Sequence, residues 1–217
     1  MNDYLRPIYL QSIWETLFMA LITLVIGGIC GLVLGILLYA TRRGGLLANK
    51  IVHTILNVIV NIIRPIPFII FMTAIAPLTL KVIGTTIGVR AATFPLCIAA
   101  TFAISRIVEQ NLVTVDPGVI EAARAMGAGP WRILVDVVAR EARGPLILGY
   151  TYILIAIVDM TAIAGALGGG GLGQFAITYG YQRYNWAVTA VAVVTIIIVV
   201  QLAQFLGNWL ARRALRR

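Results

Sequence analysis

The chain has 217 residues, of which 60% are hydrophobic and only 12% are charged. Soluble domains are typically about 45–50% apolar and about 25% charged, so this composition excludes an ordinary water-soluble domain. The net charge of +9 would suggest a nucleic-acid partner in a soluble protein. Here the charges lie between and beyond apolar runs, which indicates orientation in a lipid bilayer and no nucleic-acid partner.

Five apolar runs are long enough to cross a membrane. About 20 mostly apolar residues span a hydrocarbon core of roughly 30 Å, and backbone groups in lipid must be hydrogen-bonded within the segment. We therefore predict an all-α membrane protein, one domain over 1–217, with five transmembrane helices. Their predicted ranges are 13–40, 51–76, 86–108, 146–166 and 186–211.

The basic residues predict the orientation of these helices, because Lys and Arg are enriched in cytoplasmic segments. An external N-terminus and an internal C-terminus put twelve Lys and Arg residues inside and four outside, with Arg64 within the membrane. The twelve inner residues are Arg42, Arg43, Lys50, Arg106, Arg124, Arg132, Arg140, Arg143, Arg212, Arg213, Arg216 and Arg217. The four outer residues are Arg6, Lys81, Arg90 and Arg183.

The number of helices indicates how a solute path would be built. An odd count without visible similarity between halves argues against the internal duplication of many secondary transporters. Five helices are too few to enclose a path, and closed symmetry is usual among oligomers. We therefore expect a homodimer with the path along its two-fold axis.

Polar residues recur along the second predicted span. His53, Asn57, Asn61 and Arg64 are spaced by four, four and three residues, which puts them on one helix face. A charged side chain in a bilayer costs at least about 2.5–3.5 kcal/mol, so this face should look inward. It either lines a solute path or forms hydrogen bonds between helices, and the sequence favours neither.

Arg64 and Asp159 are expected at similar depth in the membrane. They lie 14 and 15 residues past the inner ends of their spans, roughly 21 and 22 Å. They could neutralise each other within or between subunits, or Asp159 could face water in a cavity. Pro65 and Pro67 remove two backbone donors beyond Arg64 and are expected to open a bend there.

The longest segment between spans, 116–144, has the signals of a helix with defined ends. Asp116 can cap the helix, Pro117 suits its first position, and Gly127 suits the turn after its last residue. These signals predict a short helix over 117–126 on the inner face. A second start at Gly129-Pro130 leads toward the fourth span.

This helix carries a recognisable motif, Glu-Ala-Ala followed by Gly after three residues. It resembles the EAA loop of ABC importer permeases, whose coupling helix docks on the ATPase subunit. By itself the triplet is more typical of an ordinary amphipathic surface helix, but its location after the third span favours a coupling helix. Small alanines allow close approach to a partner, and glycine lets the chain turn back. The resemblance implies that the coupling residues are Glu121, Ala122, Ala123, Arg124, Met126 and Gly127.

A broader resemblance, to the permeases of methionine-type importers, rests on the segments 64–70, 84–88, 168–173 and 179–183. It implies a bacterial inner-membrane protein that transports methionine, including D-methionine or derivatives. The implied partners are a second copy, two ATPase subunits that bind ATP and Mg²⁺, and a solute-binding protein or lipoprotein outside. Two positions depart from the family pattern: Ala139-Arg140 replaces an expected Leu-Pro pair, and Asp159 replaces a small or neutral residue.

Glycines dominate the predicted outer loop between spans four and five. Each Gly costs about 1 kcal/mol relative to Ala in a helix, so this stretch should not remain helical. It is a candidate outer gate or docking loop, and a flexible connector is the alternative. The glycines are Gly168, Gly169, Gly170, Gly171 and Gly173.

Catalytic groups are scarce in the sequence. It has no G-x-x-x-x-G-K-[ST] loop, no nucleophile with a neighbouring base, and no metal site implied by Cys30 and Cys97. We therefore expect a non-catalytic permease without a cofactor of its own, with Asn57, Asn61, Arg64 and Asp159 as candidate path residues. The alternatives are a permease for another small amino acid or a self-sufficient secondary carrier. Co-purification of an ATPase separates the carrier from the importer.

Overall fold

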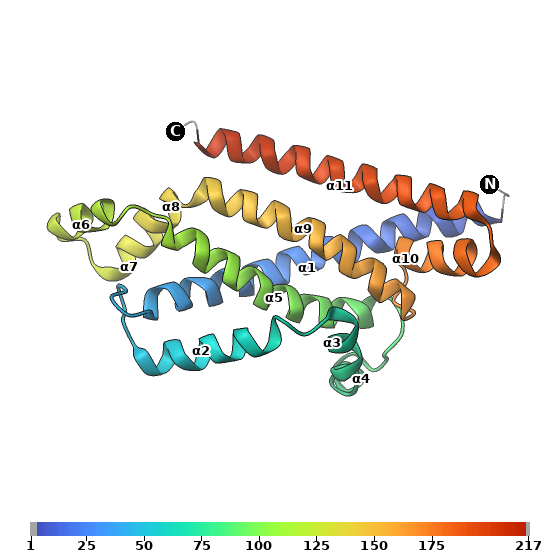
Figure 1. The fold of residues 1–217 in the computed structure, drawn as a ribbon, viewed down its shortest axis with the longest axis horizontal. Coiled ribbons are helices and arrows are strands. Elements are labelled where there is room, and N and C mark those ends of the chain that lie inside the picture. Colours follow the sequence, from blue (N-terminus) through green and yellow to red (C-terminus); the bar gives the residue numbers. More distant parts are fainter. Residues whose placement is uncertain (1–3, 216–217) are drawn as a thin grey trace.

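The computed structural model describes residues 4–215, which form an elongated bundle of helices (Figure 1). Five segments run along the bundle. They are α1 (Leu5–Thr41), α2 (Lys50–Ile63), α5 (Val89–Val113), α9 (Arg143–Ala166) and α11 (Trp186–Leu215). The short helix α3 (Phe68–Ala74) follows α2 after a bend.

Shorter helices lie at the two ends of the bundle (Figure 1). We call these ends the α6 end, which includes the last turns of α1, α5 and α11, and the α10 end, which includes their first turns. The short helices of the α6 end are α6 (Pro117–Ala125), α7 (Pro130–Arg132), the π-helix η1 (Ile133–Val138) and α8 (Ala139–Glu141). Those of the α10 end are α4 (Ala76–Ile83), α10 (Gly171–Phe175), the π-helix η2 (Ala176–Gly180) and the 3-10 helix η3 (Tyr181–Arg183).

The prediction of an all-α protein with several membrane spans is confirmed. Four helices, α1, α5, α9 and α11, are long and apolar enough to cross a bilayer, and α2 with α3 is a fifth if the bent pair forms one span. The observed helices extend past several predicted limits: α1 begins at Leu5 instead of 13, and α5 ends at Val113 instead of 108. Hydropathy ends a span at the first charges, whereas backbone hydrogen bonds continue through them.

The second predicted span, 51–76, is not one helix, and this part of the prediction is wrong. α2 ends at Ile63, α3 begins at Phe68, and the two axes differ by 105°. Pro65 and Pro67 explain the break, because each lacks an N–H and disfavours helical geometry in the residue before it. The expected bend is therefore present, but it turns α3 across the bundle.

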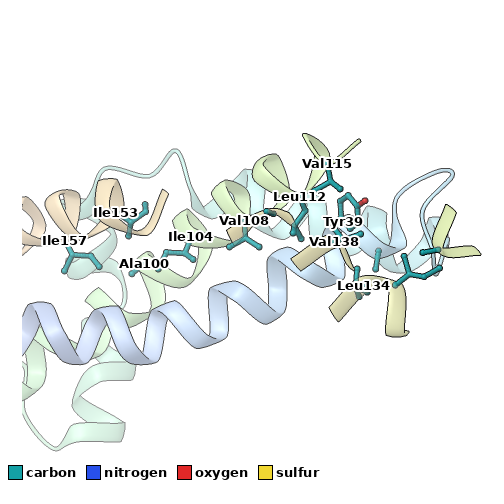
Figure 2. Packing of buried hydrophobic residues seen from close by; sticks show 14 of the residues in the cluster. Tyr39, Ala100, Ile104, Val108, Leu112, Val115, Leu134, Val138, Ile153 and Ile157 are labelled. Carbon is teal, nitrogen blue, oxygen red and sulfur yellow. The ribbon is translucent and has the colours of Figure 1, made fainter. Parts of the chain in front are cut away.

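The centre of the bundle is built on the close packing of α1 against α5. A Cβ added at Gly31 would lie 2.7 Å from Cβ of Ile104, so only glycine permits this approach. The buried side chains of α5 then continue toward the α6 end, where Val138 of η1 and Tyr39 of α1 join the same cluster (Figure 2). The short helices of the α6 end are thus anchored in the hydrophobic core.

The Lys and Arg residues are distributed unequally between the two ends of the bundle. Within the described residues, the α6 end holds nine of the predicted inner Lys and Arg residues, and the α10 end holds the four predicted outer ones. Arg216 and Arg217 lie outside the described residues. The prediction for Arg106 is wrong, because this residue lies inside α5, seven residues before Val113, and not in a connecting segment.

Candidate functional site

The predicted helix over 117–126 is present as α6. The Asp116 side chain accepts a hydrogen bond from the Gly118 N–H at 2.7 Å, and Pro117 is the first helical residue. Gly127 has φ +80°, a left-handed conformation that favours glycine, and its N–H donates to the Arg124 carbonyl at 2.9 Å. Both ends of α6 are therefore fixed by the signals that predicted them.

The residues of the EAA motif divide between the core and the surface. Ala123 is 3% exposed and belongs to the core cluster of Figure 2, so its small side chain serves close packing within the chain. The other motif residues are exposed, and Met126 is 82% exposed. With exposed Val119 and Trp131 nearby along the chain, they give the α6 end a mixed apolar and charged surface. The exposed motif residues are Glu121, Ala122, Arg124, Met126 and Gly127.

The Ala139-Arg140 departure falls where the chain re-enters the bundle. Without a proline there, the backbone stays helical from η1 through α8, and the Ala142 N–H donates to the Val138 carbonyl at 3.0 Å. Arg140 forms an exposed ion pair with Asp136 at 3.3 Å. The departure therefore preserves a nearly continuous helical path from α7 into α9.

The polar stripe of α2 meets a charged pair on α5, Arg106 and Glu109, of which Arg106 was expected in an inner connecting segment. Arg106 donates to Glu109 at 2.6 Å and to the Asn57 side-chain oxygen at 2.9 Å, and it also donates to Asn61. Only 16% of the Arg106 side chain and 12% of the Glu109 side chain are exposed. His53 Nδ1 lies 3.2 Å from the Leu38 carbonyl oxygen.

This arrangement gives the α2 stripe a structural role that was one of its two interpretations. Asn57 is half-buried and bonded to α5, whereas Asn61 is bonded to Arg106 but exposed. Sequence reasoning missed Arg106 and Glu109 because it counted Arg106 as a topological charge. Their spacing of three residues, next to an apolar run, is the signal that identifies a pair on one helix face.

Arg64 and Asp159 do not meet within the chain. Both are exposed, and neither belongs to an ion pair among the residues that the structure describes. Arg64 lies instead at a cavity of about 60 Å³, beside Phe68, Phe71 and Met160. The hypothesis of a neutralising pair within one subunit is therefore wrong, since the bend after α2 gives Arg64 other neighbours.

The glycine-rich stretch is an ordered turn attached to α1. Gly170 and Gly171 have φ near +88° and +78°. The Gly171 N–H donates to the Glu15 carboxylate at 2.7 Å, and the Leu172 N–H donates to the Thr16 hydroxyl at 2.8 Å. Two side chains of α1 thus satisfy the first free N–H groups of α10.

The expectation of a non-helical loop is correct for Gly168, Gly169 and Gly170 and wrong for the other two glycines. Gly171 begins α10, so Gly173 is helical, and Leu172 and Phe175 are each 1% exposed. The segment packs against α9 and α1, which excludes the flexible connector. Beside the turn lies a cavity of about 460 Å³ with a mixed lining that includes Gln11, Glu15 and Gln174.

Comparison with known proteins identifies the family. Residues 31–216 match the family described as binding-protein-dependent transport system inner membrane component. Because this match covers most of the chain, the protein belongs to that family and is an integral component of the bacterial inner membrane.

Particular relatives extend the comparison. The chain is 41% identical over 204 residues to "Probable D-methionine transport system permease protein MetI" of Vibrio cholerae, covering 94% of this chain and 91% of the relative. It is 43% identical over 172 residues to "Methionine import system permease protein MetP" of Bacillus subtilis, covering 79% and 78%. A solved structure of the MetNI methionine ABC transporter in an inward-facing conformation has a TM-score of 0.96 at 40% identity, with 99% of both chains covered.

A more distant structure shares the fold alone. A chain of an amino acid ABC transporter crystallised with histidines has a TM-score of 0.80 at 19% identity, with 98% of this chain covered. The same helix arrangement therefore occurs with a very different sequence.

Proposed function

We propose that the chain is the membrane-spanning subunit of an ATP-driven importer for methionine, including D-methionine or close derivatives. The observation that carries the proposal is full-length similarity to methionine permeases, 41% identity over 94% of the chain, together with the TM-score of 0.96. In this function the chain binds and moves solute without chemistry of its own. ATP and Mg²⁺ bind to two separate ATPase subunits.

The proposed coupling surface is the exposed face of α6. Glu121 and Arg124 offer charges, Met126 offers a flexible apolar side chain, and Trp131 follows on α7. Exposed apolar residues rimmed by charges are typical of protein interfaces. Because Ala123 and η1 are packed in the core, motion of α6 would be transmitted directly to α5 and α9.

The proposed orientation puts the α6 end in the cytoplasm and the α10 end outside. It rests on the excess of Lys and Arg at the α6 end, which is typical of cytoplasmic segments. Reporter fusions test this orientation: we expect an external signal at residue 1 and an internal signal after residue 217. The reverse pair of signals would contradict it.

The proposed solute path lies between two copies of the chain. Exposed Asn61, Arg64 and Asp159 are polar groups at membrane depth that need water or a second subunit around them. A homodimer supplies both, with the path along its axis. At the outer end, the α10 turn and the cavity beside Glu15 form the proposed gate and the surface for a solute-binding protein.

Reconstitution tests the function. The chain, its ATPase and its binding protein are placed in vesicles, and uptake of labelled methionine is measured with and without internal ATP. We expect ATP-dependent uptake that unlabelled D-methionine reduces and other amino acids do not. Uptake driven by an ion gradient without the ATPase would instead establish a secondary carrier, and ATP-dependent uptake of another amino acid only would establish a different cargo.

A further inference from the structure

A second large cavity lies away from the proposed path. It has a volume of about 460 Å³ and is bounded by α1, α9 and α11 in the half of the bundle nearest the α6 end. Ligand pockets typically measure about 300–1,000 Å³, so the groove is large enough for a bound molecule. Its apolar walls include Leu24, Leu32, Leu146, Leu154, Leu206 and Leu210.

The polar groups in the walls are already bonded to the chain. The Tyr150 hydroxyl donates to the Gly28 carbonyl at 2.8 Å, and the Thr151 hydroxyl donates to the Ile147 carbonyl at 2.8 Å. A free amino acid carries an ammonium and a carboxylate group, and the lining offers only one charged residue, Arg143, which could pair with the carboxylate alone. The lining therefore suits a long apolar ligand.

One charged residue, Arg143, lies at one end of this apolar lining. It is the first residue of α9, it is exposed, and it takes part in no ion pair among residues 4–215. From Arg143 to Leu154 the groove follows α9 for eleven residues, roughly 16 Å at 1.5 Å per residue. The groove thus has a cationic mouth and an apolar depth.

Beyond the last groove residue of α11, Leu210, the chain is also basic. Arg212 and Arg213 lie in the last turn of α11, and the guanidinium carbon of Arg213 is 3.9 Å from the centre of the Trp209 ring. Trp is enriched where a membrane meets water, so this turn has the composition of an interface. With the orientation of the proposed function, the mouth lies at the cytoplasmic leaflet, whose anionic lipids attract Arg and Lys.

We propose that this groove is a binding site for an anionic phospholipid of the cytoplasmic leaflet. One acyl chain fills the leucine-lined groove between α9 and α11, and the phosphate lies at Arg143, at the end of the groove where the basic last turn of α11 follows Leu210. The charge of the mouth and the apolar depth select this occupant. A segment of a second subunit would need a carboxylate positioned opposite Arg143 as well as an apolar stripe. The proposal rests on the proposed orientation, but not on the identity of the transported solute.

The test measures retained lipid on the purified permease–ATPase complex by native mass spectrometry. Phosphatidylglycerol and phosphatidylethanolamine with identical chains are titrated separately. We expect tighter binding of phosphatidylglycerol, reduced about fivefold by Arg143→Gln, since one basic residue near a surface contributes about that factor. Arg143→Lys should retain most of the preference.

Two matched variants separate this site from general attraction to charge. Arg42 lies at the same end of the bundle, stacked 4.3 Å over the Tyr39 ring and outside the groove, so Arg42→Gln should leave binding unchanged. Ala203 lines the groove, and Ala203→Phe should block both lipids without altering any charge. Equal losses in the Arg42 and Arg143 variants, or normal binding in the Ala203 variant, would overturn the proposal.

A cysteine variant tests whether a second copy of the chain, and not a lipid, covers the groove. Leu206→Cys, in a background without Cys30 and Cys97, should form no intersubunit disulfide under oxidation and should run as a single chain on a denaturing gel. A disulfide-linked dimer would mean that a second copy covers the groove, which rejects the lipid. The ATPase should co-purify with each lipid-site variant. Loss of the ATPase even from the unaltered chain would contradict the proposed function, while lipid retention would still decide the groove.

Discussion

The two ends of the bundle are built in opposite ways. At the α10 end, the short helix α10 is buried, and Glu15 and Thr16 of α1 accept hydrogen bonds from its first N–H groups. At the α6 end, a short helix has one residue, Ala123, in the core and the rest of its motif on the surface. One end is completed by the chain itself, and the other presents a surface for a partner. Substitutions should therefore reduce stability at the α10 end and partner binding at the α6 end.

The largest loss of stability is expected from Gly171→Val. Gly171 has φ +78°, and a Cβ there would lie 2.7 Å from the Thr16 hydroxyl oxygen and 3.0 Å from the Met19 methyl. Left-handed strain and overpacking together should lower the free energy of unfolding by about 2–4 kcal/mol. The measurement is the thermal unfolding midpoint of the detergent-purified chain.

The matched control for this substitution lies at the α6 end. Gly129 has φ −70°, and a Cβ there would have no neighbour within 4 Å. Gly129→Val should change stability by less than about 0.5 kcal/mol. Equal losses from the two substitutions would remove the contrast between the ends.

The next effect concerns the carboxylate that holds α10. Glu15 accepts the Gly171 N–H at 2.7 Å and lies at the positive N-terminal end of α10. Glu15→Ala should cost about 2 kcal/mol, because a hydrogen bond to a charged group is lost and a peptide N–H is left without its partner. Glu15→Gln keeps an acceptor and should cost clearly less. A double mutant with Thr16→Val measures whether the two contacts act together. If the losses of unfolding free energy in the single variants simply add up in the double mutant, the two contacts are independent.

Little change in stability but a large change in function is expected at the α6 end. Glu121→Lys alters an exposed residue, so the unfolding midpoint should stay nearly the same. Reversing a charge in an interface opposes association, so we expect at least about tenfold weaker ATPase binding, measured by co-purification and by solute-stimulated ATP hydrolysis. Glu141→Lys, an equal charge reversal on α8, is the control. Normal coupling in the Glu121 variant would reject the coupling surface.

The extent of prediction from sequence differs between these regions for physical reasons. The ends of α6 were predictable because Asp116, Pro117 and Gly127 act locally, through capping and backbone geometry. The attachment of the glycine turn was not, because its partner Glu15 is 156 residues away in the chain. Distant pairings of this kind leave no local pattern.

The same reasoning applies to the middle of the bundle. Hydropathy indicated a membrane segment at 51–76, but the direction taken after Pro67 depends on packing against α5 and α9. Arg106 looked like a surface charge because its partners, Asn57 and Asn61, lie on another helix. A sequence shows which polar groups need an explanation in a membrane, and the fold decides which of them satisfy one another.

The smallest expected effect, on labelling alone, separates the two roles of the α2 stripe. Asn57 is half-buried and bonded to Arg106, whereas Asn61 and Arg64 are exposed. Single cysteines at these positions, in a background without Cys30 and Cys97, are probed with a water-soluble thiol reagent during turnover. We expect slow labelling at position 57, and fast labelling at 61 and 64 that depends on nucleotide and is slowed by methionine.

Ile59 is the control, because it lies two residues and about 200° around the helix from Asn61 and is exposed on the opposite face. If α2 lines the path, a cysteine at 59 should stay unlabelled while 61 reacts. Equal reactivity at 59 and 61 would mean that water reaches α2 without regard to its polar face. Inertness at both 61 and 64 in a complex that still transports would assign the stripe to packing and the path to other helices.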